Sequence, residues 1–306
     1  MSRMQKLLVI AGPTASGKSA LAVELALLFD CEVISADSMQ VYRHMDIGTA
    51  KPAEDEKAGV PHHLISIVDP SEEYTAAKFR EDAFRKIREI NDKGKRAVIA
   101  GGTGLYIKAL TQGLFDGPEA DRELRRGLLE EAEKKGRAAL HEKLREVDPV
   151  SASRIHPNNL HRVIRALEVY SLSRKPISDF HKEHSFAPAP FETLKIGLSM
   201  EREELYAAID RRVDMMVGAG LLEETRRLLS MGYHSGLKPM RGLGYKEMTA
   251  FIEGGYGLDE AVRLIKRNTR HYAKRQMTWF RKDPEIRWFN PGDKNCIIGL
   301  VRGFLN

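Results

Sequence analysis

The most informative segment of the chain is Gly12-Pro13-Thr14-Ala15-Ser16-Gly17-Lys18-Ser19. It follows an apolar run, Leu7 to Ala11, and precedes Ala20 to Ala26, whose apolar spacing is typical of a helix. A strand, a glycine-rich turn and a helix in this order form a P-loop, in which backbone N–H groups surround a phosphate. In such a loop Lys18 reaches the outer phosphate oxygens and the Ser19 hydroxyl coordinates Mg²⁺. The sequence therefore predicts a site for a di- or triphosphate.

Length and composition are those of a globular enzyme. The 306 residues suffice for one large domain or two, and 42% of them are hydrophobic. No apolar run approaches the roughly 20 residues that span a bilayer, and no signal-peptide pattern precedes the first strand. We therefore expect a cytoplasmic protein with no membrane partner. The net charge of +6 favours an anionic partner larger than a diphosphate.

A carboxylate is expected beside the P-loop. The second apolar run, Glu32 to Ala36, reads as a buried strand and leads directly to Asp37. Ligands of open α/β sheets bind at the carboxyl ends of the strands, so Asp37 is predicted to face the P-loop. Three roles are open to it: a carboxylate on the metal side, a general base, or only the cap of a turn.

A second glycine turn is predicted at the same edge of the sheet. The strand Arg96 to Ala100 ends in Gly101-Gly102-Thr103-Gly104. The Thr103 hydroxyl is a candidate for a hydrogen bond to substrate, and the alternative is a structural turn hydroxyl.

The chain changes character from about Gly113. Asp121 to Leu144 and Asn158 to Ser173 have helical patterns, and no strand follows either of them. Lys175 to Pro190 contains three prolines and reads as a linker. Strand character resumes at Leu194 to Ser199.

These patterns predict an α/β fold with a P-loop NTPase-like parallel sheet core and an inserted helical domain. Residues 1–115 and 191–306 would form the P-loop catalytic core with its C-terminal helices. Residues 116–190 would form the helical insertion domain.

Three basic segments are candidates for contact with phosphates. Arg241 to Lys246 places two cations around glycines, which suits a leaving phosphate; the alternative is a surface loop. Arg162 and Arg165 share a helical face near His161, where they would bind nucleic acid or simply face solvent. Residues 263–282 contain eight Lys or Arg and no acid, which favours RNA or serves solubility.

Six motifs in order along nearly the whole chain resemble the tRNA isopentenyltransferase family, the bacterial tRNA dimethylallyltransferases. They are Gly12 to Ser19, Asp37 to Arg43, Asp46 to Pro52, Gly101 to Tyr106, His161 to Glu168, and Arg241 to Tyr245. One departure is His161, where the family commonly has Gln.

The resemblance implies transfer of a dimethylallyl group from dimethylallyl diphosphate to the exocyclic amine of the adenosine on the 3′ side of the tRNA anticodon. Diphosphate is released, and Mg²⁺ is the implied cofactor. The implied catalytic residues are Asp37 as the base, Thr103, and Arg241 beside the leaving diphosphate. Residues Gly12 to Ser19 would hold the diphosphate, with Ser19 as the metal ligand. Because the anticodon stem-loop is the implied partner, the helical insertion is expected to bind tRNA, and a monomer is expected.

The resemblance also implies a set of residues in contact with tRNA. They are Asp37, Ser38, Met39, Gln40, Thr103, Arg125, His161, Arg162, Val163, Ile164, Arg165, Arg241, Gly242, Leu243, Gly244, Tyr245 and Lys246.

Two alternatives keep ATP as the ligand of the P-loop: an ATP-dependent kinase of small molecules or nucleotides, and an RNA-binding P-loop NTPase. The kinase is disfavoured because Gly101 and Gly102 follow the strand where a second metal carboxylate is expected. The NTPase predicts hydrolysis of nucleotide and no prenylated product. The sequence leaves open whether ATP also enters the P-loop.

Overall fold

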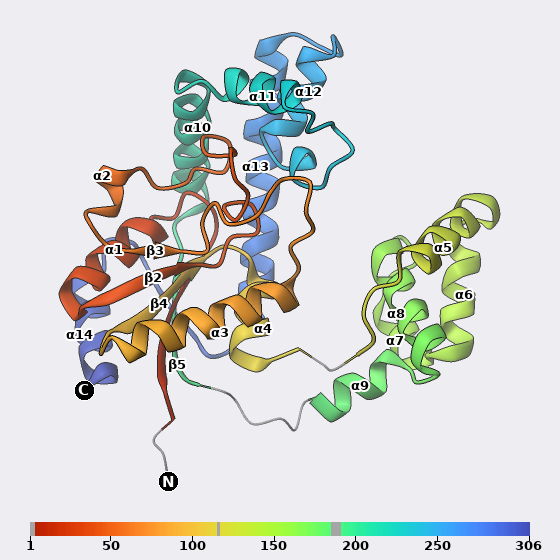
Figure 1. Cartoon of the computed structure of the whole chain (residues 1–306), viewed down its shortest axis with the longest axis horizontal. Coiled ribbons are helices and arrows are strands. Elements are labelled where there is room, and N and C mark those ends of the chain that lie inside the picture. Colours follow the sequence, from red (N-terminus) through yellow and green to blue (C-terminus); the bar gives the residue numbers. More distant parts are fainter. Residues whose placement is uncertain (1–3, 115–116, 185–190) are drawn as a thin grey trace. The chain divides into compact units, whose positions relative to one another are not determined.

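The structure, a computed structural model, describes residues 4–114, 117–184 and 191–306. Six strands form one sheet in the order β3-β2-β4-β1-β5-β6, and every neighbouring pair is parallel (Figure 1). The strands are β1 (Lys6–Ala11), β2 (Cys31–Ser35), β3 (His62–His63), β4 (Arg96–Gly101), β5 (Glu192–Leu198) and β6 (Ile286–Phe289). The predicted α/β class with a parallel sheet is confirmed.

Strand β1 lies inside the sheet and positions the P-loop. It pairs with β4 on one side and β5 on the other, so that Leu8 is opposite both Val98 and Leu194. Residues 7–11 are buried on both faces. A strand covered on both faces needs an unbroken apolar run, which is why this part of the sequence does not alternate.

Helices cover the two faces of the sheet. One face packs against α1 and α14, while the other packs against α3, α4 and the helices α10 to α13. Helices α10 and α13 pack against each other and run side by side in Figure 1. The helices of this unit are α1 (Lys18–Phe29), α2 (Glu54–Lys57), α3 (Ala76–Asp92), α4 (Gly104–Gln112), α10 (Arg202–Gly218), α11 (Leu221–Ser230), the 3-10 turn η1 (Pro239–Arg241), α12 (Tyr245–Ile252), α13 (Leu258–Phe280) and α14 (Lys294–Leu305).

The P-loop has the backbone conformation that its glycines permit. Gly12 has φ +149°, and a Cβ at this position would lie 2.7 Å from the carbonyl oxygen of Leu198. Gly17, with φ +84°, is the N-cap residue of α1. Ala15 also has a positive φ of 64°, which is unusual for a residue with a side chain and marks a constrained turn.

A second compact unit, Gly113–Ala189, contains helices and no strand among its described residues, while Met1–Gln112 and Pro190–Asn306 form the first unit. The sequence placed this division at 116 and 190, and both residues lie outside the described ranges. The unit has its own core, in which Leu140, Leu144 and Val163 are buried. Its helices are α5 (Arg122–Lys135), α6 (Arg137–Val147), α7 (Pro149–Arg154), α8 (Leu160–Ser173) and α9 (Ile177–His184).

Two local predictions differ from the structure. The expected linker from Lys175 contains α9, because Ile177 is buried against the core of the helical unit despite the neighbouring proline. The residues from His63 to Val68 also have the composition of a short strand, but β3 ends at His63, and an isolated bridge joins Tyr42 to Val68.

No helix in the described ranges is both long and apolar enough to cross a membrane.

Candidate functional site

A cavity of about 550 Å³ lies at the carboxyl edge of the sheet. Thr14, Lys18 and Ser19 of the P-loop line it, as do the residues that follow β2 and β4. The remaining walls come from α10, α13, residues 48–49, and residues before and at the start of α12. Five cationic side chains line this cavity: Lys18, Arg212, Arg241, Lys246 and Arg275. Such a lining suits a ligand with several negative charges.

Lys18 is held within the P-loop. Its ammonium group donates a hydrogen bond to the carbonyl oxygen of Pro13 at 2.5 Å. Burial, and to a smaller extent the positive charge of Arg212, lower the pKa of Lys18 to about 7, although the negative charge of Asp37 opposes both effects. A bound anion would reverse this shift, because it supplies the negative charge that the desolvated ammonium lacks.

Asp37 lies in the cavity lining, as the sequence predicted. Its Oδ1 accepts hydrogen bonds from the backbone N–H of Met39 at 2.8 Å and of Gln40 at 3.4 Å. Among the described residues, none donates a hydrogen bond to Oδ2. The turn-capping role and a chemical role are therefore compatible, since one oxygen caps the turn and the other is available to accept a proton.

Thr103 supports the segment after Asp37. Its Oγ1 accepts the backbone N–H of Ser38 at 3.0 Å and donates to the Ser38 hydroxyl at 3.3 Å. Burial raises the pKa of Tyr272 on α13, while the side chains of Gln276 and Thr103 lower it. Thr103 thus supports the segment that carries the predicted base, and its predicted contact with substrate stays a prediction.

Gln276 joins the two glycine turns. Its Oε1 accepts the backbone N–H of Thr14 at 2.8 Å, and its Nε2 donates to the carbonyl oxygen of Gly102 at 2.9 Å. A Cβ at Gly102 would lie 2.2 Å from that nitrogen, so only glycine leaves room for this amide. The side chain therefore fixes the P-loop relative to the turn that carries Thr103.

Replacing this amide should loosen both turns. Gln276→Leu leaves one backbone donor and one backbone acceptor without partners, and we expect the free energy of unfolding to fall by about 3 kcal/mol. Urea denaturation measures this change, and isothermal titration with inorganic diphosphate should show weaker binding. Thr278→Ala, an exposed site on the same helix, is the control and should change stability by less than about 0.5 kcal/mol. Equal stability of the two variants would contradict this role.

Arg212 is a site residue that the sequence analysis missed. It lies on α10, lines the cavity, and is electrostatically coupled to Lys18 and Asp37. Burial lowers its pKa, while Asp37 and Glu56 oppose that effect. Lys18, Arg212 and Asp37 thus share this part of the cavity, and the three groups together carry a net positive charge below pH 7, where Lys18 is protonated.

The predicted segment from Arg241 to Lys246 lies beside the cavity. Arg241, Gly242, Leu243, Gly244 and Lys246 line it. Tyr245 does not, because its ring is fully buried and its hydroxyl donates to Glu224 at 2.7 Å. The Tyr245 side chain is therefore unavailable to RNA, which corrects the predicted set.

Buried carboxylate Glu168 organises the predicted RNA residues of the helical unit. Arg125 donates to its two oxygens at 2.8 and 3.0 Å, and Arg165 donates to Oε2 at 2.7 Å. Val163 and Ile164 are buried in the core of the unit, so their side chains are also removed from the predicted contact set. His161 and Arg162 are exposed at the start of α8.

Three of the basic residues of α13 are paired with acids. Lys266 and Arg270 form ion pairs with Asp214 and Asp210 of α10, and Arg263 pairs with Glu260 of its own helix. Lys274 and Arg275 instead face cavities. The basic stripe of α13 was predicted from charge alone, and the acids that pair with it come mainly from a helix about 55 residues away in sequence.

The oxygen donors of the cavity fit an ion that arrives with a diphosphate. Ser19 and Asp37 both line the cavity and offer a hydroxyl and a carboxylate, which are the ligand types that Mg²⁺ prefers. No cluster of three or more His, Cys, Asp or Glu suited to a metal occurs among the residues that the structure describes. The protein groups here thus suit Mg²⁺ only where phosphate oxygens and water complete its coordination.

Comparisons with known proteins agree with these features. A family model described as IPP transferase matches residues 40–283. The chain is 54% identical to a tRNA dimethylallyltransferase of Geobacter metallireducens over 300 residues, which are 98% of this chain and 97% of that protein. It is also similar to the crystal structure of a full-length tRNA isopentenylpyrophosphate transferase from Bacillus halodurans, with 43% identity, a TM-score of 0.74, and coverage of 98% and 97% of the two chains. A eukaryotic dimethylallyltransferase acting on tRNA gives a TM-score of 0.84 at 31% identity, with coverage of 98% of this chain and 79% of the other.

Proposed function

The chain belongs to the IPP transferase family and is a tRNA prenyltransferase, and we propose that its donor is dimethylallyl diphosphate and its acceptor the exocyclic amine of the adenosine on the 3′ side of the anticodon. The enzyme would act as a monomer in the cytoplasm. The observation that supports this assignment best is a single cavity lined by a P-loop, an available carboxylate oxygen and additional cations.

The donor would bind with its diphosphate in the P-loop. Lys18, Arg212 and the loop N–H groups face the phosphates, and Arg241 lies on another wall of the same cavity. These cations stabilise the negative charge that develops on the diphosphate as it leaves. Mg²⁺, held by Ser19 and the phosphate oxygens, would neutralise part of the same charge when bound.

Transfer forms one bond and breaks another. The adenine amine nitrogen attacks the first carbon of the dimethylallyl group, and the bond from that carbon to the diphosphate oxygen breaks. The amine proton passes to Oδ2 of Asp37, whose other oxygen holds the backbone at residues 39 and 40. A neutral amine is a weak nucleophile, so charge stabilisation of the leaving group is the larger requirement.

The acceptor base must leave its stack to enter the cavity. Extrusion costs a few kcal/mol and is least expensive in a single-stranded loop, which favours an anticodon loop over a duplex. Apolar side chains of the lining, including Met39 and Leu243, are suited to contact the base or the prenyl group.

Arg162 is expected to hold an RNA phosphate. Arg162→Ala should weaken binding of an anticodon stem-loop and reduce the slope of log affinity against log salt by about 1, because one fewer counterion is displaced. Fluorescence anisotropy over a salt series measures both quantities. Lys134→Ala, an exposed cation on another helix of the same unit, is the matched control. An unchanged slope in Arg162→Ala would remove this contact.

The two ATP-based alternatives receive no support from the relatives, which are named as tRNA dimethylallyltransferases and tRNA isopentenylpyrophosphate transferases. Whether ATP also enters the P-loop is a separate question that competition with a labelled donor would answer.

The position of the acceptor can be tested with two RNAs. An anticodon stem-loop with adenosine on the 3′ side of the anticodon should gain one dimethylallyl group, and the same stem-loop with guanosine there should gain none. Equal modification of both RNAs would contradict the proposed acceptor.

A further inference from the structure

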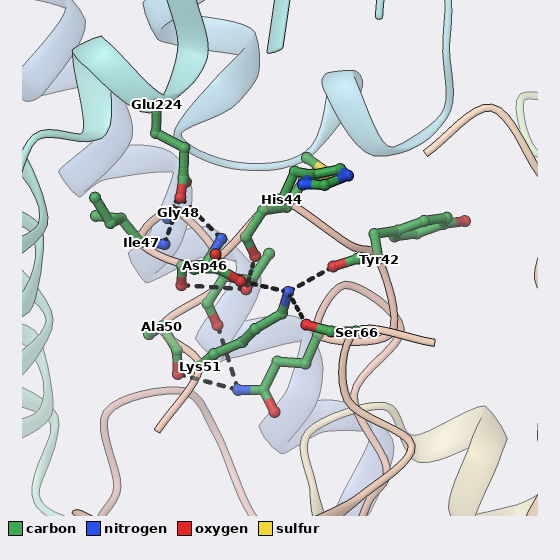
Figure 2. A network of polar contacts seen from close by, with 12 residues as sticks. Tyr42, His44, Asp46, Ile47, Gly48, Ala50, Lys51, Ser66 and Glu224 are labelled. Atoms are coloured by element: carbon green, nitrogen blue, oxygen red, sulfur yellow. Dashed lines mark hydrogen bonds and ion pairs between the residues drawn. The ribbon is translucent and has the colours of Figure 1, made fainter. Parts of the chain in front are cut away.

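Glu224 of α11 is buried, with 4% of its surface exposed, and its carboxylate holds a turn of the chain (Figure 2). Oε2 accepts the backbone N–H groups of Asp46 and Ile47, both at 2.9 Å, and Oε1 accepts that of Gly48 at 3.0 Å. The Tyr245 hydroxyl donates to Oε1 at 2.7 Å. Three successive N–H groups that point to one carboxylate form an anion nest, so the turn depends on this one side chain.

Lys51 fixes the other side of the same turn. Its ammonium group donates to the carbonyl oxygen of Tyr42 at 2.5 Å, and to Asp46 Oδ1 and Ser66 Oγ at 2.8 Å each. These bonds are drawn at the centre of Figure 2. The segment from 46 to 51 is therefore held from two directions by charged groups.

Gln40 connects the turn to the site. Its Nε2 donates to the carbonyl oxygens of Thr49 and Ala50, at 3.3 and 3.0 Å, and its Oε1 accepts from the Ser35 hydroxyl at 2.9 Å. Gln40 follows Asp37 by three residues, and Oδ1 of Asp37 accepts its backbone N–H. A shift of the turn would thus reach the segment that carries the base.

The turn itself is part of the cavity wall. Gly48 and Thr49 line the cavity, and a Cβ at Gly48 would lie 2.5 Å from the Tyr245 ring. Tyr245 begins α12, directly after lining residues 241–244. One of these, Gly242, packs on Met39 so closely that a Cβ would lie 2.5 Å from the Met39 methyl group. Glu224 therefore joins two segments of the cavity wall, residues 46–50 and residues 241–246. We call these two segments and residues 38–40 the acceptor wall.

The P-loop is held by a different network. Gln276 accepts a hydrogen bond from Thr14, whereas Glu224 and Lys51 form no hydrogen bond with residues 12–19 in the described part of the chain. A change in the acceptor wall should therefore affect RNA more than diphosphate.

We infer that Glu224 is a positioning residue for the RNA acceptor, acting through the 46–50 turn and Tyr245 on the acceptor wall. This inference rests on the proposed function, in which the adenine base enters the cavity beside this wall. Glu224 does not line the cavity and would contact neither substrate.

Glu224→Gln tests the inference with almost no change in volume. An amide nitrogen accepts no hydrogen bond, so one half of the nest loses its acceptor. We expect the KM for an anticodon stem-loop to rise about tenfold, and its directly measured Kd to rise similarly, which corresponds to about 1.4 kcal/mol. The Kd for inorganic diphosphate should stay within about twofold of the wild-type value. Glu223→Gln, an exposed neighbour on α11, is the matched control and should change neither quantity.

Tyr245→Phe provides a second variant, because it removes only the hydroxyl that donates to Glu224. It should raise the RNA Kd in the same direction and by less, and circular dichroism should show that it folds. If Glu224→Gln does not fold, Tyr245→Phe alone tests the inference. Its Kd for RNA should then rise while its Kd for diphosphate stays unchanged. Equal losses of RNA and diphosphate affinity, or no loss of RNA affinity, would overturn the inference.

The same measurements separate this inference from the proposed function. A wild-type protein that binds the stem-loop but forms no prenylated product contradicts the proposed function. The RNA and diphosphate dissociation constants of the variants still test the positioning role in that case, because they do not depend on turnover.

Discussion

Asp37→Asn is expected to slow prenyl transfer by about 10²- to 10⁴-fold, the range that a positioned general base contributes. The substitution is suited to the geometry, because the Asn side-chain oxygen can still accept the N–H of Met39 and keep the turn. What it removes is the second oxygen that would take the amine proton. Single-turnover rates with dimethylallyl diphosphate and a stem-loop RNA measure the effect.

The control for Asp37→Asn is its affinity for diphosphate and RNA, which the substitution should not change. The Kd values of diphosphate and RNA should stay within about threefold of those of the wild-type protein, a difference below 1 kcal/mol. Asp92→Asn, an exposed carboxylate at the end of α3, should leave the rate unchanged. A rate for Asp37→Asn close to that of the wild type would exclude Asp37 as the base.

Lys18→Met should slow transfer by about 10²- to 10³-fold, the usual cost of removing one group that stabilises transition-state charge. It should also weaken binding of diphosphate, because Lys18 faces the same cavity as the P-loop hydroxyls. Methionine retains a similar length and removes only the charge and its donors. Rates and dissociation constants that match the wild type would contradict the assignment of the P-loop as the donor site.

The pH dependence of binding gives this prediction a second readout. The free site holds the pKa of Lys18 at about 7 through burial and Arg212, and a bound anion raises it. Below pH 7 the ammonium is charged in both states and no proton is taken up. Above pH 7 the free protein carries a neutral amine and the complex a charged one, so diphosphate affinity should fall by up to about tenfold per pH unit.

Calorimetric titration in two buffers of different ionisation enthalpy measures the protons taken up on binding. Titration of diphosphate itself contributes to this number, and Lys18→Met reports that contribution alone. The wild-type protein should take up more protons than the variant at pH 8. Equal uptake would show that Lys18 does not titrate with the ligand.

The sequence predicted the parts of the site that lie on consecutive residues. The P-loop and Asp37 each follow an apolar strand directly, and a parallel sheet brings the ends of its strands together. This local rule places residues 12–19, 37–40 and 101–104 at one edge, and the structure has them there.

The residues that were missed lie on helices. Arg212 shares a stripe with Leu205, Ile209 and Val213, where spacing alone indicates a buried face. Gln276 and Glu224 likewise interrupt apolar stripes of α13 and α11. A polar residue on an apolar stripe is the signal that could have found all three, since such side chains are seldom buried without a partner.

Several basic residues that the sequence offers as RNA contacts are instead paired with acids that lie far away in the sequence. Arg125 donates a hydrogen bond to Glu168, which lies 43 positions away in the sequence. The sequence alone therefore gives no indication that this arginine has an acidic partner. Asp210 and Asp214 of α10 likewise form ion pairs with Arg270 and Lys266 of α13. Charge counts along the chain cannot show such pairing, because it depends on which helices pack together.

The most direct test of the account is the mass of the RNA product. The purified protein would be incubated with Mg²⁺, dimethylallyl diphosphate and an unmodified anticodon stem-loop, and the RNA would then be analysed by intact mass spectrometry. A gain of one dimethylallyl group, absent with Asp37→Asn on the same time scale, is the predicted result. An RNA of unchanged mass, with phosphate released from ATP in a parallel reaction, would contradict the account and favour an RNA-binding NTPase.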